Sequence, residues 1–230
     1  ALEEIAEKLT PALSEHANNI SLNEQLFARV KAVYDKKESL QLTPEERRLL
    51  EKSYDGFVRN GANLSEEDKA TFRKLSMELS SLTLKFSQNH LKETNGYELV
   101  LHTEDELAGL PESAIEAAAH TAREKGKEGC WVITLQAPSY VPFMKYSDKR
   151  ELRKTLYMAY NTQCCHDNEF NNLKIVEQLV NLRMELAQLL GFKNYAEYVL
   201  KKRMAENSEN VYKLLNDLLK AYTPTARQEV

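Results

Sequence analysis

Glycine, proline and cysteine are scarce in this sequence, and each scarcity excludes a class of protein. The 230 residues include 7 glycines and 6 prolines, too few for the many turns of a β-sandwich or β-barrel and for a disordered chain. The 3 cysteines, Cys130, Cys164 and Cys165, are an odd number without CxxC spacing. That pattern argues against a disulfide framework and against a zinc ribbon, and three reduced thiols weakly favour a reducing compartment.

Long apolar runs and an excess of positive charge are also missing. No run approaches the roughly 18 apolar residues of a membrane-spanning helix, and no signal peptide opens the chain. The net charge of −4 gives no electrostatic basis for non-specific nucleic-acid binding. We therefore expect neither a nucleic acid nor a membrane as partner.

The two ends of the sequence both have the character of mid-protein sequence. Ala1 lies inside an amphipathic pattern without an initial Met, and Val230 follows no helix cap. We therefore expect a segment of a longer protein with a cytoplasmic location. A periplasmic or exported location is the alternative if a signal segment precedes residue 1.

The chain is rich in signals that begin and end helices. Thr43-Pro44-Glu45-Glu46 is a capping box with proline at the first helical position, and Asn60-Gly61 ends that helix. A second, long helix is predicted from Ser65 to Asn95-Gly96. Its apolar residues recur at spacings of three and four: Phe72, Leu75, Leu79, Leu82 and Phe86. We predict a mainly α fold that begins with an antiparallel helical array.

The pattern changes after Gly96. Alternating residues predict a strand over 97–101, and a β-branched run predicts a second strand over 130–135, with a helix from Pro111 to Lys125 between them. A helical crossover predicts parallel, right-handed pairing of the two strands. The proline-rich residues after Leu135 predict an extended segment.

These patterns predict three parts of the chain. Residues 1–95 form a helical scaffold, 96–146 a small α/β unit, and 147–230 a further helical region. Within the last part we expect a helix from about Glu169 to Leu190. Another helix begins at Ser208, and Pro224 kinks or ends it.

A helical zinc site is the first kind of chemistry to look for in such a chain. Helical zinc peptidases place two histidines four residues apart with a glutamate between them, and none of the five histidines begins an HExxH motif. The next best arrangement recurs every four residues along one predicted helix face: Glu112, Glu116, His120 and Glu124. A solvated polar face is the favoured interpretation over a metal site, because metal sites usually draw ligands from more than one element.

Two further groups of residues have a functional and a structural interpretation. Cys164-Cys165-His166-Asp167 resembles a Cys/His nucleophile pair, but a loop with Asp167 or Asn168 as the next helix cap is favoured. A basic group with aromatic neighbours could hold a peptide carboxylate or a phosphate. A solvated helix start is favoured for this group: Lys145, Lys149, Arg150, Arg153 and Lys154, near Tyr140, Phe143 and Tyr146.

Four separated blocks carry a family resemblance that extends from about Leu42 to Val230. They are LSEED at 64–68 with LSMELSSLTLKFSQNHL after it, ELAGLPES at 106–113, TLQAPSYVPFMKYSDKRELRKTLYMAY at 134–160, and LLGFKNYAEY at 189–198. In this order the blocks resemble the thimet-oligopeptidase-like zinc metallopeptidases, in the peptidyl-dipeptidase (Dcp) branch.

The resemblance implies a long helical enzyme that releases dipeptides from the C-terminus of oligopeptides through a deep channel. Its zinc ligands and HExxH helix lie downstream of the matched region, so no catalytic or metal residue transfers to this sequence. The chain is then an internal, inactive segment of the parent enzyme. A small sheet flanks the channel, and the residues that match it would pair with extended substrate: Trp131, Val132, Ile133, Thr134 and Leu135.

The implied partners are an oligopeptide substrate and the parent's own catalytic core. Without that core, exposed apolar faces could cause non-native self-association. The alternative is a stand-alone helical module that binds a peptide or protein without catalysis. An HExxH motif beyond Val230 would distinguish the first interpretation from the second.

Overall fold

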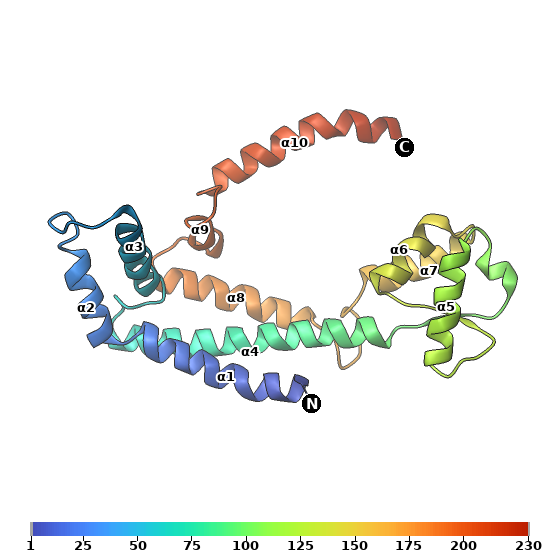
Figure 1. The fold of residues 1–230 in the computed structure, drawn as a ribbon, viewed down its shortest axis with the longest axis horizontal. Coiled ribbons are helices and arrows are strands. Elements are labelled where there is room, and N and C mark those ends of the chain that lie inside the picture. Colours follow the sequence, from blue (N-terminus) through green and yellow to red (C-terminus); the bar gives the residue numbers. More distant parts are fainter. Residues whose placement is uncertain (1, 230) are drawn as a thin grey trace. The chain divides into compact units, whose positions relative to one another are not determined.

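The computed structural model describes residues 2–229 and confirms a mainly α fold (Figure 1). The chain divides into two compact units. The helical unit comprises Ala1–Leu82 with Gln178–Val230, and the mixed unit comprises Thr83–Glu177. None of the described helices combines the length and apolarity that a membrane crossing requires. The three-part division stays a prediction.

The helical unit is built around apolar residues from three stretches of the chain. Its elements are α1 (Leu2–Ser21), α2 (Glu24–Tyr34), α3 (Pro44–Arg59), the first part of α4 (Glu66–Gly96), most of α8 (Leu173–Leu189), α9 (Tyr195–Leu200) and α10 (Ser208–Glu229). The buried cluster contains Leu22, Phe72, Leu75, Leu182 and Leu186. Leu79 and Leu82 pack against it, so four residues of the predicted α4 seam face this core. Phe86 belongs to the other unit and is 37% exposed.

The predicted helix boundaries of α3 and α4 are confirmed. The Thr43 hydroxyl accepts a hydrogen bond from the Glu46 N–H at 3.2 Å, and the Glu46 carboxylate accepts one from the Thr43 N–H at 2.9 Å. This reciprocal cap satisfies two amide groups that a helix start leaves unpaired. Asn60 caps the C-terminus, and Gly61 follows with φ of 86°.

The mixed unit places two short strands among helices. After the end of α4 come β1 (Leu99–Leu101), the 3-10 helix η1 (Glu104–Leu107), α5 (Glu112–Glu124), β2 (Trp131–Ile133), α6 (Ala137–Tyr146), α7 (Arg150–Asn161) and the start of α8. Its core is formed by apolar residues of these elements: Leu101, Leu107, Leu110, Ala118, Ile133, Leu135, Phe143 and Leu156.

The strands pair antiparallel, so the prediction of parallel pairing is wrong. Leu99 lies opposite Ile133 and Leu101 lies opposite Trp131. The chain therefore enters β2 at the end where it leaves β1. A helical connection makes two strands parallel only when it returns the chain to the opposite end of the sheet. Here η1 and α5 both lie in the connection, and the chain comes back to the end of the sheet that it left, so no crossover forms.

The extended segment predicted after β2 is also wrong, because residues 137–146 form α6. Pro138 lies in the first helical turn, where a missing N–H costs nothing. Pro142 lies one turn later, where it leaves a carbonyl of the first turn without a donor. The buried Phe143, 1% exposed, anchors the helix in the core and offsets this loss.

One predicted boundary in the last third of the chain is wrong. Helix α8 begins at Leu173 rather than near Glu169, and Asn172, not Asp167 or Asn168, precedes it. Asn172 is held before the helix by its own N–H, which donates to the Cys164 carbonyl at 2.8 Å. Of the two alternatives predicted for Pro224, the end of the helix is wrong, because α10 continues past Pro224 to Glu229, and water can hydrate the unpaired carbonyl of an exposed helix.

Candidate functional site

The strand predicted to flank a peptide channel is divided between the sheet and the turn after it. Trp131, Val132 and Ile133 form β2, whereas Thr134 and Leu135 follow it. The sheet has the order β1-β2, so within residues 2–229 each strand pairs on one side. Val132, Ile133 and Leu135 are at most 3% exposed. Their side chains are committed to the core, and the backbone is the part of β2 that remains available for pairing.

A small pocket lies at the end of β2. It has a volume of about 140 Å³ and is lined by Ile133 and Thr134, by the alanines Ala114, Ala117 and Ala118 of α5, and by α6 residues. The Thr134 N–H donates to the Ser139 hydroxyl at 2.9 Å and is therefore already paired. The volume is below the roughly 300 Å³ of small-molecule sites, so the pocket suits a single small side chain.

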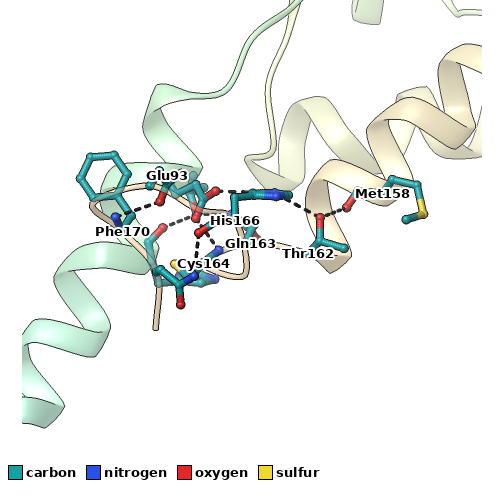
Figure 2. A network of polar contacts seen from close by, with 11 residues as sticks. Glu93, Met158, Thr162, Gln163, Cys164, His166 and Phe170 are labelled. Carbon is teal, nitrogen blue, oxygen red and sulfur yellow. Dashed lines mark hydrogen bonds and ion pairs between the residues drawn. The ribbon is translucent and has the colours of Figure 1, made fainter. Parts of the chain in front are cut away.

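A polar network surrounds Glu93, near the end of α4 (Figure 2). The Glu93 carboxylate accepts a hydrogen bond from the Cys164 N–H and lies 3.8 Å from His166 Nε2. The same nitrogen lies 3.3 Å from the Thr162 hydroxyl, which donates to the Met158 carbonyl at 2.7 Å. Because that donation uses the only proton of the hydroxyl, we assign His166 Nε2 as the donor to Thr162.

The loop between α7 and α8 is held on α4 by further hydrogen bonds. The Gln163 side chain donates to the Thr94 hydroxyl at 2.6 Å, and Asn89 donates to Asn172 at 2.9 Å. Cys164 has a left-handed backbone with φ of 58°, which turns its N–H toward Glu93. The loop interpretation of residues 164–167 therefore fits the structure.

The chemistry of Cys164 disfavours a nucleophile. Burial, reinforced by the nearby Glu93 carboxylate, raises the pKa of the Cys164 thiol to about 12. Because the thiolate is the reactive form, a thiol with this pKa is inert near neutral pH. Cys165 is exposed, and exposure alone does not indicate a catalytic role.

A larger pocket opens beside this network, and local sequence patterns gave no sign of it. Its volume is about 480 Å³, and it is lined by eight residues: Glu93, Tyr97, Leu135, Thr155, Met158, Ala159, Thr162 and His166. They come from α4 and the residue after it, the turn after β2, α7 and the following loop. Glu93 and His166, at the two ends of this set, lie 73 residues apart in the sequence, so only the folded chain brings them together.

The predicted polar face of α5 is solvated. His120 Nδ1 lies 3.5 Å from a Glu124 carboxylate oxygen, and the two side chains are 64% and 66% exposed. Within residues 2–229 no group of three or more His, Cys, Asp or Glu residues could hold a metal ion. The described residues therefore do not fit a zinc site.

The basic residues near α7 find partners within the chain. Lys149 Nζ lies 2.6 Å from an Asp105 carboxylate oxygen, and the Arg153 guanidinium donates to the Ser147 carbonyl. Lys145 Nζ lies 5.0 Å from the centre of the Tyr146 ring. These contacts favour a structural role at the start of α7 over a shared anion site.

Comparisons with known proteins find similarity to one family of peptidases. Residues 143–230 match the model of peptidase family M3. Over its full length the chain is 35% identical to oligopeptidase A of Haemophilus influenzae, of which it covers 34%. It is 35% identical over 227 residues to dipeptidyl carboxypeptidase of Escherichia coli, covering 99% of this chain and 33% of that protein.

The chain thus spans about a third of the length of the curated relatives it matches. The matches confirm the family resemblance that the sequence blocks indicated. Residues 143–230 thus match peptidase family M3, and the chain is similar along its length to both oligopeptidase A and dipeptidyl carboxypeptidase.

Proposed function

We propose that the chain is a non-catalytic segment of a zinc metallopeptidase that releases dipeptides from the C-terminus of oligopeptides. In this proposal it forms helical channel wall and scaffold. The observation that supports it most is the similarity along the whole chain to a dipeptidyl carboxypeptidase. Zinc would activate the attacking water, and its ligands would lie outside this chain, since the described residues do not fit a zinc site.

The role proposed for β2 is backbone pairing with extended substrate. Its side chains are buried, the sheet is two strands wide, and a small pocket lies at its end. Strand addition uses such an arrangement: main-chain hydrogen bonds give affinity and neighbouring pockets select side chains.

The dipeptide specificity can be tested with the complete protein that carries this chain. An N-acetylated oligopeptide with a free C-terminus should lose successive dipeptides, as followed by mass spectrometry. Its C-terminally amidated twin should be cleaved much more slowly. Internal cuts that ignore amidation would instead assign an endopeptidase and overturn the dipeptide part of the proposal.

The role of β2 can be tested by proline substitution in the same protein. Val132→Pro should raise KM, by about 2–10-fold for each substrate hydrogen bond lost. Thr134→Pro removes an N–H that is already paired with Ser139, so it should raise KM only by displacing the end of β2. Ser139→Ala is the control for Thr134→Pro, because it removes the acceptor of the Thr134 N–H without adding a proline. Unchanged kinetics in both proline variants would contradict the pairing role.

A helical binding module without catalysis is the second candidate. The pocket of about 480 Å³ beside Glu93 is compatible with it, because binding there needs no metal. The coding sequence that follows Val230 separates the two candidates. An in-frame HExxH motif with a later glutamate favours the peptidase, and its absence favours the module.

A further inference from the structure

We propose that Glu93 and the apolar pocket beside it form a binding site for a lysine or arginine side chain of a peptide. We call this site the Glu93 pocket, defined by its eight lining residues: Glu93, Tyr97, Leu135, Thr155, Met158, Ala159, Thr162 and His166. The inference deepens the proposed function and rests on it for the identity of the peptide, but side-chain binding itself can be measured without cleavage.

The walls of the Glu93 pocket are mostly apolar. Leu135, Met158 and Ala159 line it together with the Tyr97 ring, and its volume of about 480 Å³ lies within the usual range of ligand sites. The side chains of lysine and arginine carry three or four methylene groups before the charge. Such stems lie favourably against apolar surface while the charged end reaches a polar group.

The charge of the pocket comes from one carboxylate. The Glu93 side chain is 14% exposed, and the His166 side chain that faces it is 51% exposed. A carboxylate withdrawn from water is stabilised by a cation that can donate hydrogen bonds to it. The accepted bond from the Cys164 N–H leaves further lone pairs of this carboxylate for such a donor.

His166 is a neighbour of Glu93 but does not satisfy its charge. The His166 Nε2 lies 3.8 Å from a Glu93 oxygen (Figure 2), which is beyond hydrogen-bond distance, and it donates to the Thr162 hydroxyl. The Glu93 carboxylate therefore stays open to a ligand cation. Burial raises the pKa of Tyr97, which follows α4, and of the Cys164 thiol, so neither of these groups carries a charge near neutral pH.

The chemistry favours a basic side chain over other ligands. An anion would meet the Glu93 charge in a poorly hydrated pocket, which is unfavourable. An uncharged aliphatic chain would pack against the apolar walls but leave the Glu93 carboxylate without a cation. Only an aliphatic stem that ends in a cation satisfies both parts of the lining.

The experiment compares two matched probes, acetyl-lysinamide and acetyl-norleucinamide, on the complete protein. They share the four-carbon stem and differ in the terminal ammonium group. Neither contains a bond between two amino acids, so peptidase activity does not act on them. Dissociation constants would be measured by ligand-observed NMR titration at pH 7.5.

We expect acetyl-lysinamide to bind about tenfold tighter than acetyl-norleucinamide at pH 7.5, as for a hydrogen bond to a charged group. Glu93→Gln should abolish the preference while keeping an acceptor for the Cys164 N–H. His166→Asn should keep the preference, because the ammonium group of the probe binds the Glu93 carboxylate and not the imidazole.

Glu124→Gln is the matched control. Glu124 also faces a histidine, His120, at 3.5 Å, but on a solvated helix face, so this variant should bind both probes as the unchanged protein does. Equal binding of the two probes, or a preference that survives Glu93→Gln, would overturn the site. Normal probe binding in a protein that does not release dipeptides would overturn the proposed function and leave the site standing.

Discussion

Gly109 shows how one residue fixes the path of the mixed unit. Its φ is 87°, a left-handed value, and an added Cβ would lie 2.3 Å from the Tyr146 carbonyl oxygen and 2.8 Å from the Asp148 amide nitrogen. Next to it, the Asp148 N–H donates to the Ala108 carbonyl at 2.8 Å. The turn after η1 and the turn after α6 can therefore touch only where a side chain is missing.

We predict that Gly109→Ala lowers the free energy of unfolding by several kcal/mol more than Gly129→Ala. Both glycines have positive φ, but no atom lies within 4 Å of a Cβ at Gly129. Gly129→Ala therefore measures the left-handed strain alone, roughly 1–2 kcal/mol. Urea unfolding of the two variants checks the difference, and equal losses would show that the turns separate without cost.

We predict that the neighbouring thiols of Cys164 and Cys165 differ in their rate of alkylation. Iodoacetamide at pH 8 should alkylate the exposed Cys165 and leave Cys164 unmodified, because burial raises the pKa of the Cys164 thiol to about 12. Peptide mapping by mass spectrometry distinguishes the two neighbours. Modification of Cys164 at the rate of Cys165 would mean that the loop opens readily from α4.

At the scale of elements, the junction of α4 and α8 depends on a buried pair of amides. Asn89 donates to Asn172 at 2.9 Å, and Asn172 donates to the Phe86 carbonyl at 3.1 Å. Both side chains belong to residues no more than 6% exposed. An unpaired polar group at this depth is costly.

We predict that Asn172→Ala lowers the free energy of unfolding by roughly 1–3 kcal/mol. Adding Asn89→Ala should cost less than Asn89→Ala alone, since the two changes remove one shared interaction. A double-mutant cycle in urea measures this coupling, with the exposed Asn161→Ala as control at roughly 0.5 kcal/mol or less. Additive losses would contradict the shared bond.

Prediction from sequence succeeded where the signal is local and failed where it depends on distant contacts. The capping box at Thr43 and the ends at Gly61 and Gly96 involve neighbours in the chain, and the structure has them as predicted. The pairing direction of β1 and β2 and the helix at Pro138 depend on tertiary packing, which overrode the local pattern.

The candidate site follows the same rule. The strand over Trp131–Ile133 was visible from its β-branched residues, whereas the Glu93 pocket was not. Glu93 and His166 are ordinary surface residues in their local sequence, and their meeting depends on the left-handed turn at Cys164. No spacing rule joins residues that are brought together by such a turn.

At the scale of the whole molecule, the chain exposes many large apolar side chains. On α10 six of them are between 37% and 67% exposed: Tyr212, Leu214, Leu215, Leu218, Leu219 and Tyr222. On α1 the exposed ones are Leu2, Ile5, Leu9, Leu13 and Ile20. Surfaces of this kind usually contact another protein surface.

We predict that the 230-residue chain self-associates when it is produced alone. Sedimentation velocity should show a weight-average mass that rises with protein concentration above 26.4 kDa. Leu215→Gln with Leu219→Gln should lower this association, whereas Lys213→Gln with Lys220→Gln, on the same helix, should not. A single species of monomer mass at every concentration would contradict the prediction.

The helical unit is interrupted in the chain by the whole mixed unit. Phe72 and Leu75 are covered by Leu182 and Leu186, which leave the ribosome about a hundred residues later. At the usual rates of synthesis this is a delay of roughly 5–20 s. During it the mixed unit can fold first, although it begins later in the sequence. Until then the apolar residues of the earlier helices stay exposed to water. The order of folding is therefore the reverse of the order of synthesis. In this interval the earlier helices expose the apolar surface that chaperones bind.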